Sequence, residues 1–553
     1  MRQKIKELIA AAYRKLLAEP PPEFEVERPK VKAHGDLASN IALVAARVTG
    51  RPTRDLAASL AAELKQLPIL EKIEIAGGGF LNLTLRAAAW QESLREIDAA
   101  GDRWGRSDVG RGKRVLVEFV SANPTGPVHI GNARGGPLGD ALASLLEASG
   151  FEVVREYYVN DVGGQIAKLG QSLMHWISPD KFPELGYQGE YVRELAERAR
   201  NELKPEFAGS NPEALAEKLG SFAIDQMMKE VRDDCTKMGI RFDSWIREKE
   251  LLASGETGRT IEELRKRGVV VEKEGALWLA TQDEFLQDRE CVLVKSDGQP
   301  TYFANDVAYH AGKFRRGFDR LIDIWGSNHH GHVPRMKSAL ASLGFDPDRF
   351  EVVLYQYVRV KRGAEAVKMS KRGGNFVTAR EVLDEVGPDP FRFFLLMRAP
   401  ESHLDFDLEL AKRHSQENPV YYVQYAHARL ASLFRKAAES GLAEGGPRAT
   451  VALSRLTLPE EIDLIRLLHE FPDEVRRAAE RLEPHRIPFY LLELTKLFQS
   501  YYTRAKEDPR YRVLGGDIDT TGAKLYLAKI LQRTIANGLK LIGVSAPEVM
   551  ENE

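Results

Sequence analysis

The alternation of apolar and polar positions is clearest between residues 113 and 161, where two short apolar runs flank a longer helical segment. The first run, KRVLVEFV at 113–120, is compact and rich in β-branched residues, as is typical of a strand buried on both faces of a parallel sheet. The helical stretch HIGNARGGPLGDALASLLEASG follows, and the second run, FEVVREYYVND, ends at residue 161. Strand, helix and strand at this spacing predict the opening of a doubly wound nucleotide-binding fold.

The rest of the chain divides into a small N-terminal part and a long helical tail. Residues 1–90 begin with an amphipathic helix, and IEIAGGGFLNLTL at 73–85 alternates like a strand that three glycines interrupt, so we expect a small α+β domain. Over 401–553, Leu, Ile and Tyr recur at helical spacing, which predicts an all-α helical bundle. We therefore expect an α/β multidomain protein whose Rossmann-like parallel-sheet core spans 110–400, with a helical insertion at about 165–290.

Composition restricts the kind of protein. The 553 residues carry a net charge of −2, so a general nucleic-acid coat protein is not expected, whereas a selective RNA binder is compatible with this balance. Only two cysteines, Cys235 and Cys291, are present, which excludes a disulfide framework and a four-thiolate zinc site. No apolar run is long enough to span a membrane, and the N-terminus lacks the pattern of a signal peptide. We expect a cytoplasmic protein with reduced thiols and no membrane partner.

The loop SANPTGPVHIGN at 121–132 joins the first predicted strand to its helix. Unpaired backbone N–H groups at a helix N-terminus carry partial positive charge and attract anions. Gly131 lets adenine or ribose lie against the backbone, and His129 is able to donate a hydrogen bond to a phosphate oxygen. A purely structural turn is the alternative. The chain has no GxxxxGK[ST] and no GxGxxG sequence, so an ordinary P-loop ATPase or NAD enzyme is not expected.

A second motif, VKMSKRGGN at 367–375, lies in a strongly basic window. The segment 359–372 holds six basic residues and one acidic residue. Gly373 and Gly374 permit a mobile loop, and a mobile lysine loop is able to close over a triphosphate and to leave with pyrophosphate. The alternative is a solvated basic surface loop.

Together, the two motifs resemble those of the class I aminoacyl-tRNA synthetases, with an HIGH-like sequence after the first strand and a KMSK sequence after the last. Attack of an amino-acid carboxylate on the α-phosphate of ATP needs positioning and charge stabilisation but no covalent nucleophile. The resemblance implies that His129 and Lys371 contact the transferring phosphate, that Lys368 assists, and that Mg²⁺ arrives with ATP as substrate. Asn132 stands where the family more often has His. The other residues of the expected ATP site are Gly131, Met369 and Ser370.

Acidic positions indicate what the amino-acid pocket recognises. Glu118 and Asn123 lie at the end of the first predicted strand, and Tyr302 and Asp306 are four residues apart, on one face if that segment is helical. A guanidinium group is planar and always charged, so a carboxylate with additional acceptors holds it best. Asp306 with the Tyr302 hydroxyl meets this requirement, and Glu118 adds negative charge. The alternative is a surface Asp beside a core Tyr.

A closer resemblance includes the same residues. EFVSANPTGPVHIGNARG, YYVNDVGGQI, TYFAND, GSNHHGHVPRMK and KMSKRGGNFVT are similar to motifs of the arginyl-tRNA synthetase family, and 401–429 resembles that family's entry into its anticodon-binding domain. The resemblance implies a monomeric ligase that joins L-arginine to tRNA(Arg) with ATP and holds no tightly bound cofactor. The residues that it places at the arginine pocket are Glu118, Ser121, Asn123, Tyr302, Asp306, His329 and His330.

The resemblance also gives the end domains a task. The first domain of the family touches the outer corner of tRNA, so Phe80 is expected to stack on an unpaired base and Asn82 to bind its edge. In the helical bundle, Tyr425 and Arg429 are expected near the anticodon. The alternatives are a core strand position for Phe80 and a core aromatic stripe for the helix.

Three other interpretations stay open at this point. The histidines at 329, 330 and 332 are alternatively a metal site, although three imidazoles within four residues do not easily face one ion. Another class I synthetase is an alternative for the whole chain, but two distant cysteines argue against the zinc thiolates of a cysteine pocket. A non-catalytic tRNA-binding paralogue is the third alternative, and the intact ATP motifs argue against it.

Overall fold

The computed structural model describes residues 1–183, 186–204, 211–281, 283, 285–286, 291–363, 365–366, 377–442 and 451–550. The chain forms two compact units. The core unit comprises Gly105–His427, Pro472–Leu492 and Ile535–Glu553. The flanking unit comprises Met1–Trp104, Ala428–Phe471 and Glu493–Thr534.

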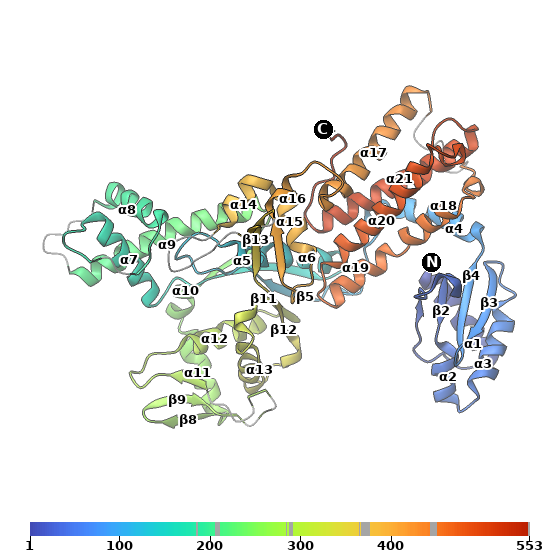
Figure 1. Ribbon diagram of the computed structural model, residues 1–553. Helices are drawn as coiled ribbons and strands as arrows, with labels where there is room; N and C mark the ends of the chain where they lie inside the picture. Colours follow the sequence, from blue (N-terminus) through green and yellow to red (C-terminus); the bar gives the residue numbers. More distant parts are fainter. Residues whose placement is uncertain are drawn as a thin grey trace. The chain divides into compact units, whose positions relative to one another are not determined.

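A five-stranded parallel sheet forms the centre of the core unit (Figure 1). Its strand order is β12-β11-β5-β6-β7, so the chain begins in the middle at β5 and extends the sheet first on one side and then on the other. Ligands of doubly wound folds bind beyond the carboxyl ends of the strands where this order reverses, here between β5 and β11. The predicted fold class is confirmed. The strands are β5 Arg114–Glu118, β6 Glu152–Val159, β7 Ser244–Arg247, β11 Arg320–Gly326 and β12 Phe350–Tyr355.

Helices pack closely on this sheet because its central strand is apolar on both faces. Val115, Leu116 and Val117 of β5 are all buried. A Cβ atom on Gly139 of α6 would lie 2.2 Å from Cγ of Phe119, so only glycine fits at this contact. The helices nearest the carboxyl ends of the strands are α5 Ile130–Ala133, α6 Gly135–Ala148, α12 Tyr302–Arg315 and α13 His332–Ser342.

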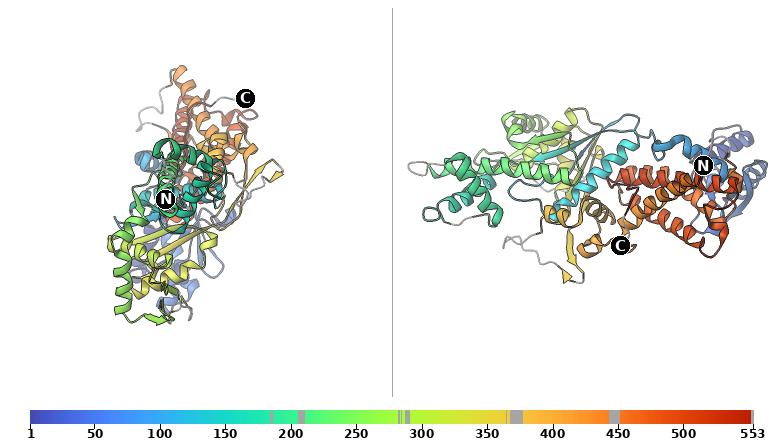
Figure 2. Two further views of the ribbon diagram at one scale, coloured as in Figure 1. Left: turned by 90° about the vertical axis from the view of Figure 1, so that its left-hand side faces the viewer. Right: turned by 90° about the horizontal axis from the view of Figure 1, so that it is seen from above.

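The segment between β6 and β11 contains a helical subdomain and a small sheet. Helices α7 (Gly164–Ile177) and α9 (Pro212–Lys237) lie side by side (Figure 2). A Cβ atom on Gly170 would lie 1.8 Å from the Ala216 carbonyl oxygen, and one on Gly220 would lie 2.3 Å from the Ile166 carbonyl oxygen, so glycines allow the close contact. The other elements are α8 Glu190–Leu203, α10 Glu248–Ala253, α11 Glu256–Lys266, and the antiparallel strands β8 Val270–Lys273, β9 Ala276–Leu279 and β10 Cys291–Val294.

After β12 the chain forms a second small sheet, with the order β14-β13-β15, and then becomes helical. Among the described residues, no helix is both long and apolar enough to cross a membrane. The strands are β13 Val358–Arg362, β14 Glu365–Ala366 and β15 Leu404–Asp407. The helices are α14 Ala379–Val386, α15 Pro388–Leu396, α16 Leu408–Lys412, α17 Pro419–Glu439, α18 Pro459–Leu468, α19 Phe471–Glu480, α20 Arg486–Arg504 and α21 Ile518–Leu541.

The N-terminal part of the flanking unit is an antiparallel sheet of order β1-β2-β4-β3 with helices. The segment 73–85, which the alternation predicted as one interrupted strand, is a hairpin of β3 and β4. Gly77 and Gly79 have φ angles of 53° and 128°, which let the chain reverse between the two strands. The elements are α1 Arg2–Leu17, β1 Val26–Glu27, β2 Leu37–Ser39, α2 Ile41–Thr49, α3 Thr53–Leu64, β3 Leu70–Ala76, β4 Phe80–Leu85 and α4 Ala87–Ala100.

Candidate active site

A cavity of about 790 Å³ opens at the carboxyl ends of β5 and β11, where the strand order of the sheet reverses. Its walls come from the loop after β5, the start of α5, the turn after β6, α12 and the segment after β11. The structure therefore gathers residues from Glu118 to Tyr357, which are far apart in the sequence. The lining residues that the sequence predicted are Glu118, Ser121, Asn123, His129, Asn132, Asp306 and His329.

His129 caps the N-terminus of α5. Its Nδ1 atom accepts a hydrogen bond from the Gly131 N–H at 2.9 Å. A neutral imidazole that accepts at Nδ1 carries its proton on Nε2, and that nitrogen is then a donor of the kind that a phosphate oxygen needs. A Cβ atom on Gly131 would lie 2.9 Å from Nδ1 of His129, so this turn requires glycine. Asn132 lines the cavity one residue further on.

Backbone hydrogen bonds join the HIGN turn to the residues that follow the second motif. The Ile130 N–H donates to the Val377 carbonyl at 3.1 Å, and the Ala379 N–H donates to the Val128 carbonyl at 2.8 Å. The motif itself, with the predicted ATP-site residues Lys368, Met369, Ser370 and Lys371, lies outside the described residues. The chain nevertheless returns to the HIGN turn directly after the motif.

Glu118 ends β5 and leads into a strained turn. Val120 and Ser121 have φ angles of 67° and 37°, a region that non-glycine residues rarely adopt and that is often found at functional sites. Ser121 Oγ donates to Glu118 Oε1 at 2.9 Å and accepts from the Tyr158 N–H at 3.0 Å. The turn thus holds one oxygen of the Glu118 carboxylate at the wall of the cavity.

The predicted pair Tyr302 and Asp306 lies on α12, as the spacing required. Asp306 lines the cavity, and its Oδ2 atom is 2.8 Å from Nε2 of His332. Tyr302 does not belong to the lining: its side chain is 52% exposed and its hydroxyl lies against Gly163, where a Cβ atom would be 2.2 Å away. Asn123 does line the cavity and donates to Gln165 Oε1 at 3.2 Å.

The three histidines after β11 have different positions. His329 and His332 line the cavity, and both contact Trp325, with ring centroids 6.3 and 5.6 Å away. His330, which the resemblance placed at the pocket, is exposed and does not line it. Burial, together with the neighbouring His332, lowers the pKa of His329. Among the described residues, no cluster of three ligand atoms suited to a metal includes these histidines.

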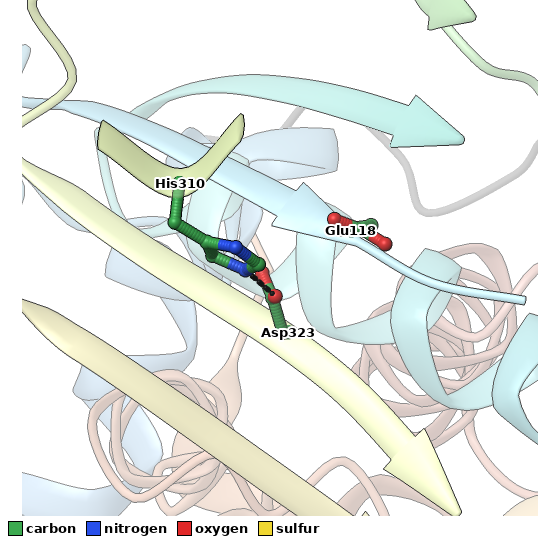
Figure 3. A group of neighbouring side chains, drawn as sticks. All are labelled: Glu118, His310 and Asp323. Atoms are coloured by element: carbon green, nitrogen blue, oxygen red, sulfur yellow. Dashed lines mark hydrogen bonds and ion pairs between the residues drawn. The ribbon is translucent and has the colours of Figure 1, made fainter. Parts of the chain in front are cut away.

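A buried group of polar and charged side chains adjoins the cavity, and two of its members, Glu118 and His310, line it. Figure 3 shows Glu118 at the end of β5 beside His310 of α12 and Asp323 of β11, whose side chains face one another. Ligand atoms of these three residues lie within 4.8 Å of one another, as in a metal site. The Lys313 ammonium already provides the cation there, because Nζ lies 2.6 Å from Glu118 Oε2 and 3.0 Å from Asp323 Oδ1.

Sequence reasoning missed two further residues of the site. Arg134 lies outside the cavity lining, is fully buried and donates to the carbonyls of Gln356, Ser402 and Ala399 at 2.8, 2.9 and 3.0 Å. It thus fixes the start of α6 to the turn between β12 and β13 and to the segment before β15. Burial lowers its pKa to about 10. Tyr158 lines the cavity at the end of β6. Both residues lie within motifs that carry the family resemblance, but the motifs alone do not predict these contacts.

The predicted RNA-contacting residues differ in exposure. Phe80 is 44% exposed, so it is not the core strand residue of the alternative, whereas Asn82 is buried within the sheet. Tyr425 is half-buried and stacks on the buried Tyr421 at 5.8 Å. Arg429 lies 4.9 Å from the ring centre of Tyr502 and donates to Gln499. Their roles in tRNA binding stay predictions.

The doubly wound sheet and the joined HIGN turn define the catalytic domain of a class I aminoacyl-tRNA synthetase, and residues 98–389 match "tRNA synthetases class I (R), catalytic domain". Residues 3–85 match "Arginyl tRNA synthetase N terminal domain" and residues 423–550 match "DALR anticodon binding domain". The chain belongs to the arginyl-tRNA synthetase family, as its motifs predicted.

Similar proteins span the whole chain. The arginine–tRNA ligase of Desulfosudis oleivorans is 45% identical over 562 residues, with 100% of this chain and 99% of that protein covered. That of Citrifermentans bemidjiense is 45% identical over 543 residues, with 96% and 95% covered. The solved structure of Thermus thermophilus arginyl-tRNA synthetase has a TM-score of 0.79 and 25% identity, with 100% of both chains covered.

Proposed function

We propose that the chain is an arginine–tRNA ligase that activates L-arginine with ATP and transfers it to the 3′-terminal adenosine of tRNA(Arg), releasing AMP and pyrophosphate. Family membership over the whole chain carries this conclusion. The N-terminal domain, the catalytic domain and the anticodon-binding domain all match in chain order, which supports the assignment. ATP is a substrate of this family's reaction, and Mg²⁺ is proposed to arrive with it.

The cavity supports in-line attack of the arginine carboxylate on the α-phosphate. His129 lies at its wall with Nδ1 occupied by the Gly131 N–H, so Nε2 is oriented as a donor for a phosphate oxygen. Lys371, with Lys368 assisting, is proposed to contact the transferring phosphate, on a loop that closes over the triphosphate and opens when pyrophosphate leaves. The backbone pairing of residues 128–130 with 377–379 supports this arrangement, because it ties the turn to the chain that follows the lysine motif.

Three other lining residues of the cavity suit a guanidinium group. Asp306 and Glu118 supply carboxylates, and Asn123 adds an amide oxygen, so a planar cation with five N–H donors finds several acceptors. Ser121 holds Glu118, and His332 holds Asp306, which reduces the conformational freedom that substrate binding would otherwise remove. Tyr302 and His330 are not supported as contacts by their positions in this state.

The two ends of the chain are proposed to bind tRNA(Arg). The exposed ring of Phe80 supports stacking on an unpaired base, and Tyr425 with Arg429 is proposed to contact the anticodon side. The burial of Asn82 supports a structural role in the sheet over a contact with a base. The monomeric state and the cytoplasmic location stay predictions from the sequence.

An aminoacylation assay with a panel of labelled amino acids tests the assignment. The purified chain, ATP, Mg²⁺ and unfractionated tRNA should give labelled tRNA with arginine and none above background with lysine, methionine or cysteine. Arginine-dependent ATP–pyrophosphate exchange should require tRNA(Arg), as the family resemblance implies. Charging with a different amino acid would indicate another class I synthetase, and no charging at all would indicate a non-catalytic paralogue.

A further inference from the structure

Three carboxylates lie in a row across the parallel sheet. Asp323 of β11 and Glu156 of β6 are the register partners of Glu118 on either side of β5. Side chains at the same register of neighbouring parallel strands point to the same face, so the three acids share one face of the sheet. All three are buried. Such a row is unstable unless cations face it, because buried charges require partners.

Helix α12 and its C-cap residue supply basic side chains that face this row. His310, Lys313 and Arg316 follow one another at intervals of three residues, the spacing of side chains on one face of a helix. His310 Nε2 lies 2.7 Å from Asp323 Oδ2, and Arg316 lies 2.6 and 2.8 Å from the two oxygens of Glu156. Lys313 lies between them and bridges Glu118 and Asp323. This is the same helix whose first turns carry Asp306 to the cavity.

The contacts of His310 leave Lys313 as the cation of Glu118. The Nδ1 atom of His310 faces the Asp306 carbonyl oxygen at 2.8 Å, and Nε2 faces the Asp323 carboxylate. Both ring nitrogens therefore meet oxygen acceptors, which a neutral imidazole is unable to satisfy with one proton. His310 Nε2 is thus paired with Asp323. Glu118 has no other cation within hydrogen-bond distance among the described residues than Lys313.

We infer that Lys313, which does not line the cavity, is a positioning residue for arginine: its ammonium keeps Glu118 an oriented carboxylate that accepts from the substrate guanidinium. The inference rests on the proposed arginine pocket. Ser121 occupies one Glu118 oxygen and Lys313 the other, which leaves each oxygen a second lone pair. Without Lys313, Glu118 would be buried beside Asp323 and would hold a proton, so it would offer a donor where the guanidinium needs an acceptor.

The pKa shifts of Glu118 and Asp323 support the dependence of the Glu118 charge on Lys313. Burial raises the pKa of the Glu118 carboxyl, against the opposing effect of Lys313. Burial also acts on Asp323, but Lys313 and His310 together hold its pKa below the ordinary value. Lys313 therefore favours the charged form of both carboxyls, and of the two only Glu118 has a raised pKa despite it. The ionisable groups around it are Tyr309, His310, Lys313 and Arg316 from α12, Asp323 from β11, and Glu156, Tyr157 and Tyr158 from β6.

The variant Lys313→Met tests the inference through the arginine KM of tRNA charging. At pH 7 this KM should rise about 10- to 100-fold, the loss expected for one charge-assisted hydrogen bond, while kcat and the ATP KM change less. Raising the pH from 6.5 to 8.5 should lower the arginine KM of the variant, because the Glu118 carboxylate is regained. The wild type should show no such recovery. An arginine KM within threefold of wild type, or an increase that is independent of pH, would overturn the inference.

Arg316→Met is the matched control. It removes a cation from the same face of α12 and leaves a buried carboxylate, Glu156, without its arginine, but it does not touch Glu118. Its melting temperature should fall, and its arginine KM should stay within threefold of wild type. Equal increases of the arginine KM in both variants would show that Lys313 has only a structural role as an ion-pair partner, and would overturn the inference.

A double variant separates positioning from folding. If Lys313 acts through Glu118, then adding Lys313→Met to Glu118→Gln should change the arginine KM by less than threefold, since no carboxylate remains to be kept charged. Comparing Glu118→Gln with the double variant tests the inference even if Lys313→Met alone does not fold, because the double variant has no unpaired charge at position 118. A further large increase overturns the inference. If the wild type fails to charge tRNA with arginine, the proposed function fails instead.

Discussion

Replacing Asp306 with asparagine removes the carboxylate that stands most openly at the cavity wall. Its Oδ2 atom is 2.8 Å from His332, so Oδ1 is left to accept from the substrate guanidinium. The amide keeps the size but has a single oxygen, which His332 occupies, so about one charge-assisted hydrogen bond to the guanidinium is lost. Such a bond contributes about 1.5–3 kcal/mol, which corresponds to a rise of roughly 10- to 150-fold in the arginine KM.

Steady-state charging of tRNA with varied arginine measures this effect directly. The ATP KM and the melting temperature should stay close to wild type, because Asp306 is partly exposed and its side chain bonds to His332 among the described residues. Asp348→Asn, which alters a carboxylate that is 89% exposed and outside the cavity, is the matched control and should leave the arginine KM unchanged. An arginine KM within twofold of wild type for Asp306→Asn would refute the assignment of this wall to the guanidinium.

Three further predictions concern the lysine motif, the packing of the sheet and a buried histidine. Lys371→Ala should slow arginine-dependent pyrophosphate exchange with tRNA present by about 10²- to 10³-fold, with tRNA affinity within a few-fold; unchanged exchange would move the ATP role away from this motif. Gly139→Ala should cost about 1–3 kcal/mol of unfolding free energy or more, because its Cβ atom would lie 2.2 Å from Phe119. Gly258→Ala, at a helical glycine with nothing within 4 Å, is the control in the same denaturation series and should not lower the unfolding free energy. Burial lowers the pKa of His469 to about 3, so the unfolded chain takes up a proton at this histidine before the folded chain does, and the free energy of unfolding should fall as the pH drops from about 6.5 towards 3. His469→Gln should flatten that pH dependence in urea titrations at pH 7 and 5.5. An unaltered pH dependence in the variant would contradict the assignment of the effect to His469.

The doubly wound core was predictable because its strands are short apolar runs that a parallel sheet buries on both faces. The position of Asp306 on a helix also followed from its spacing to Tyr302, and both residues lie on α12. The orientation of Tyr302 did not follow. Its ring lies against Gly163, a contact that depends on where the loop after β6 passes.

Contacts set by the register of the sheet were out of reach for sequence reasoning. Lys313 and Glu118 are 195 residues apart, and only the alignment of β5 with β11 and the placement of α12 bring them together. The histidines after β11 show the same limit on a smaller scale. The short 3₁₀ turn Ser327–His329 decides that His329 and His332 line the cavity and that His330 points elsewhere. At 73–85, the apolar alternation continued across a turn that the positive φ angles of two glycines create.

The ratio of kcat/KM for arginine and citrulline tests the central claim most directly. Citrulline has the same length and shape but carries a neutral ureido group, so it lacks the charge and the donor that the Asp306 and Glu118 carboxylates would recognise. A site built to bond those donors rejects such an analogue by about 10³-fold or more, because its buried acceptors are left unpaired. The account predicts tRNA charging with arginine and a preference of at least that size. Charging with citrulline within tenfold of arginine, or no charging with arginine, would contradict it.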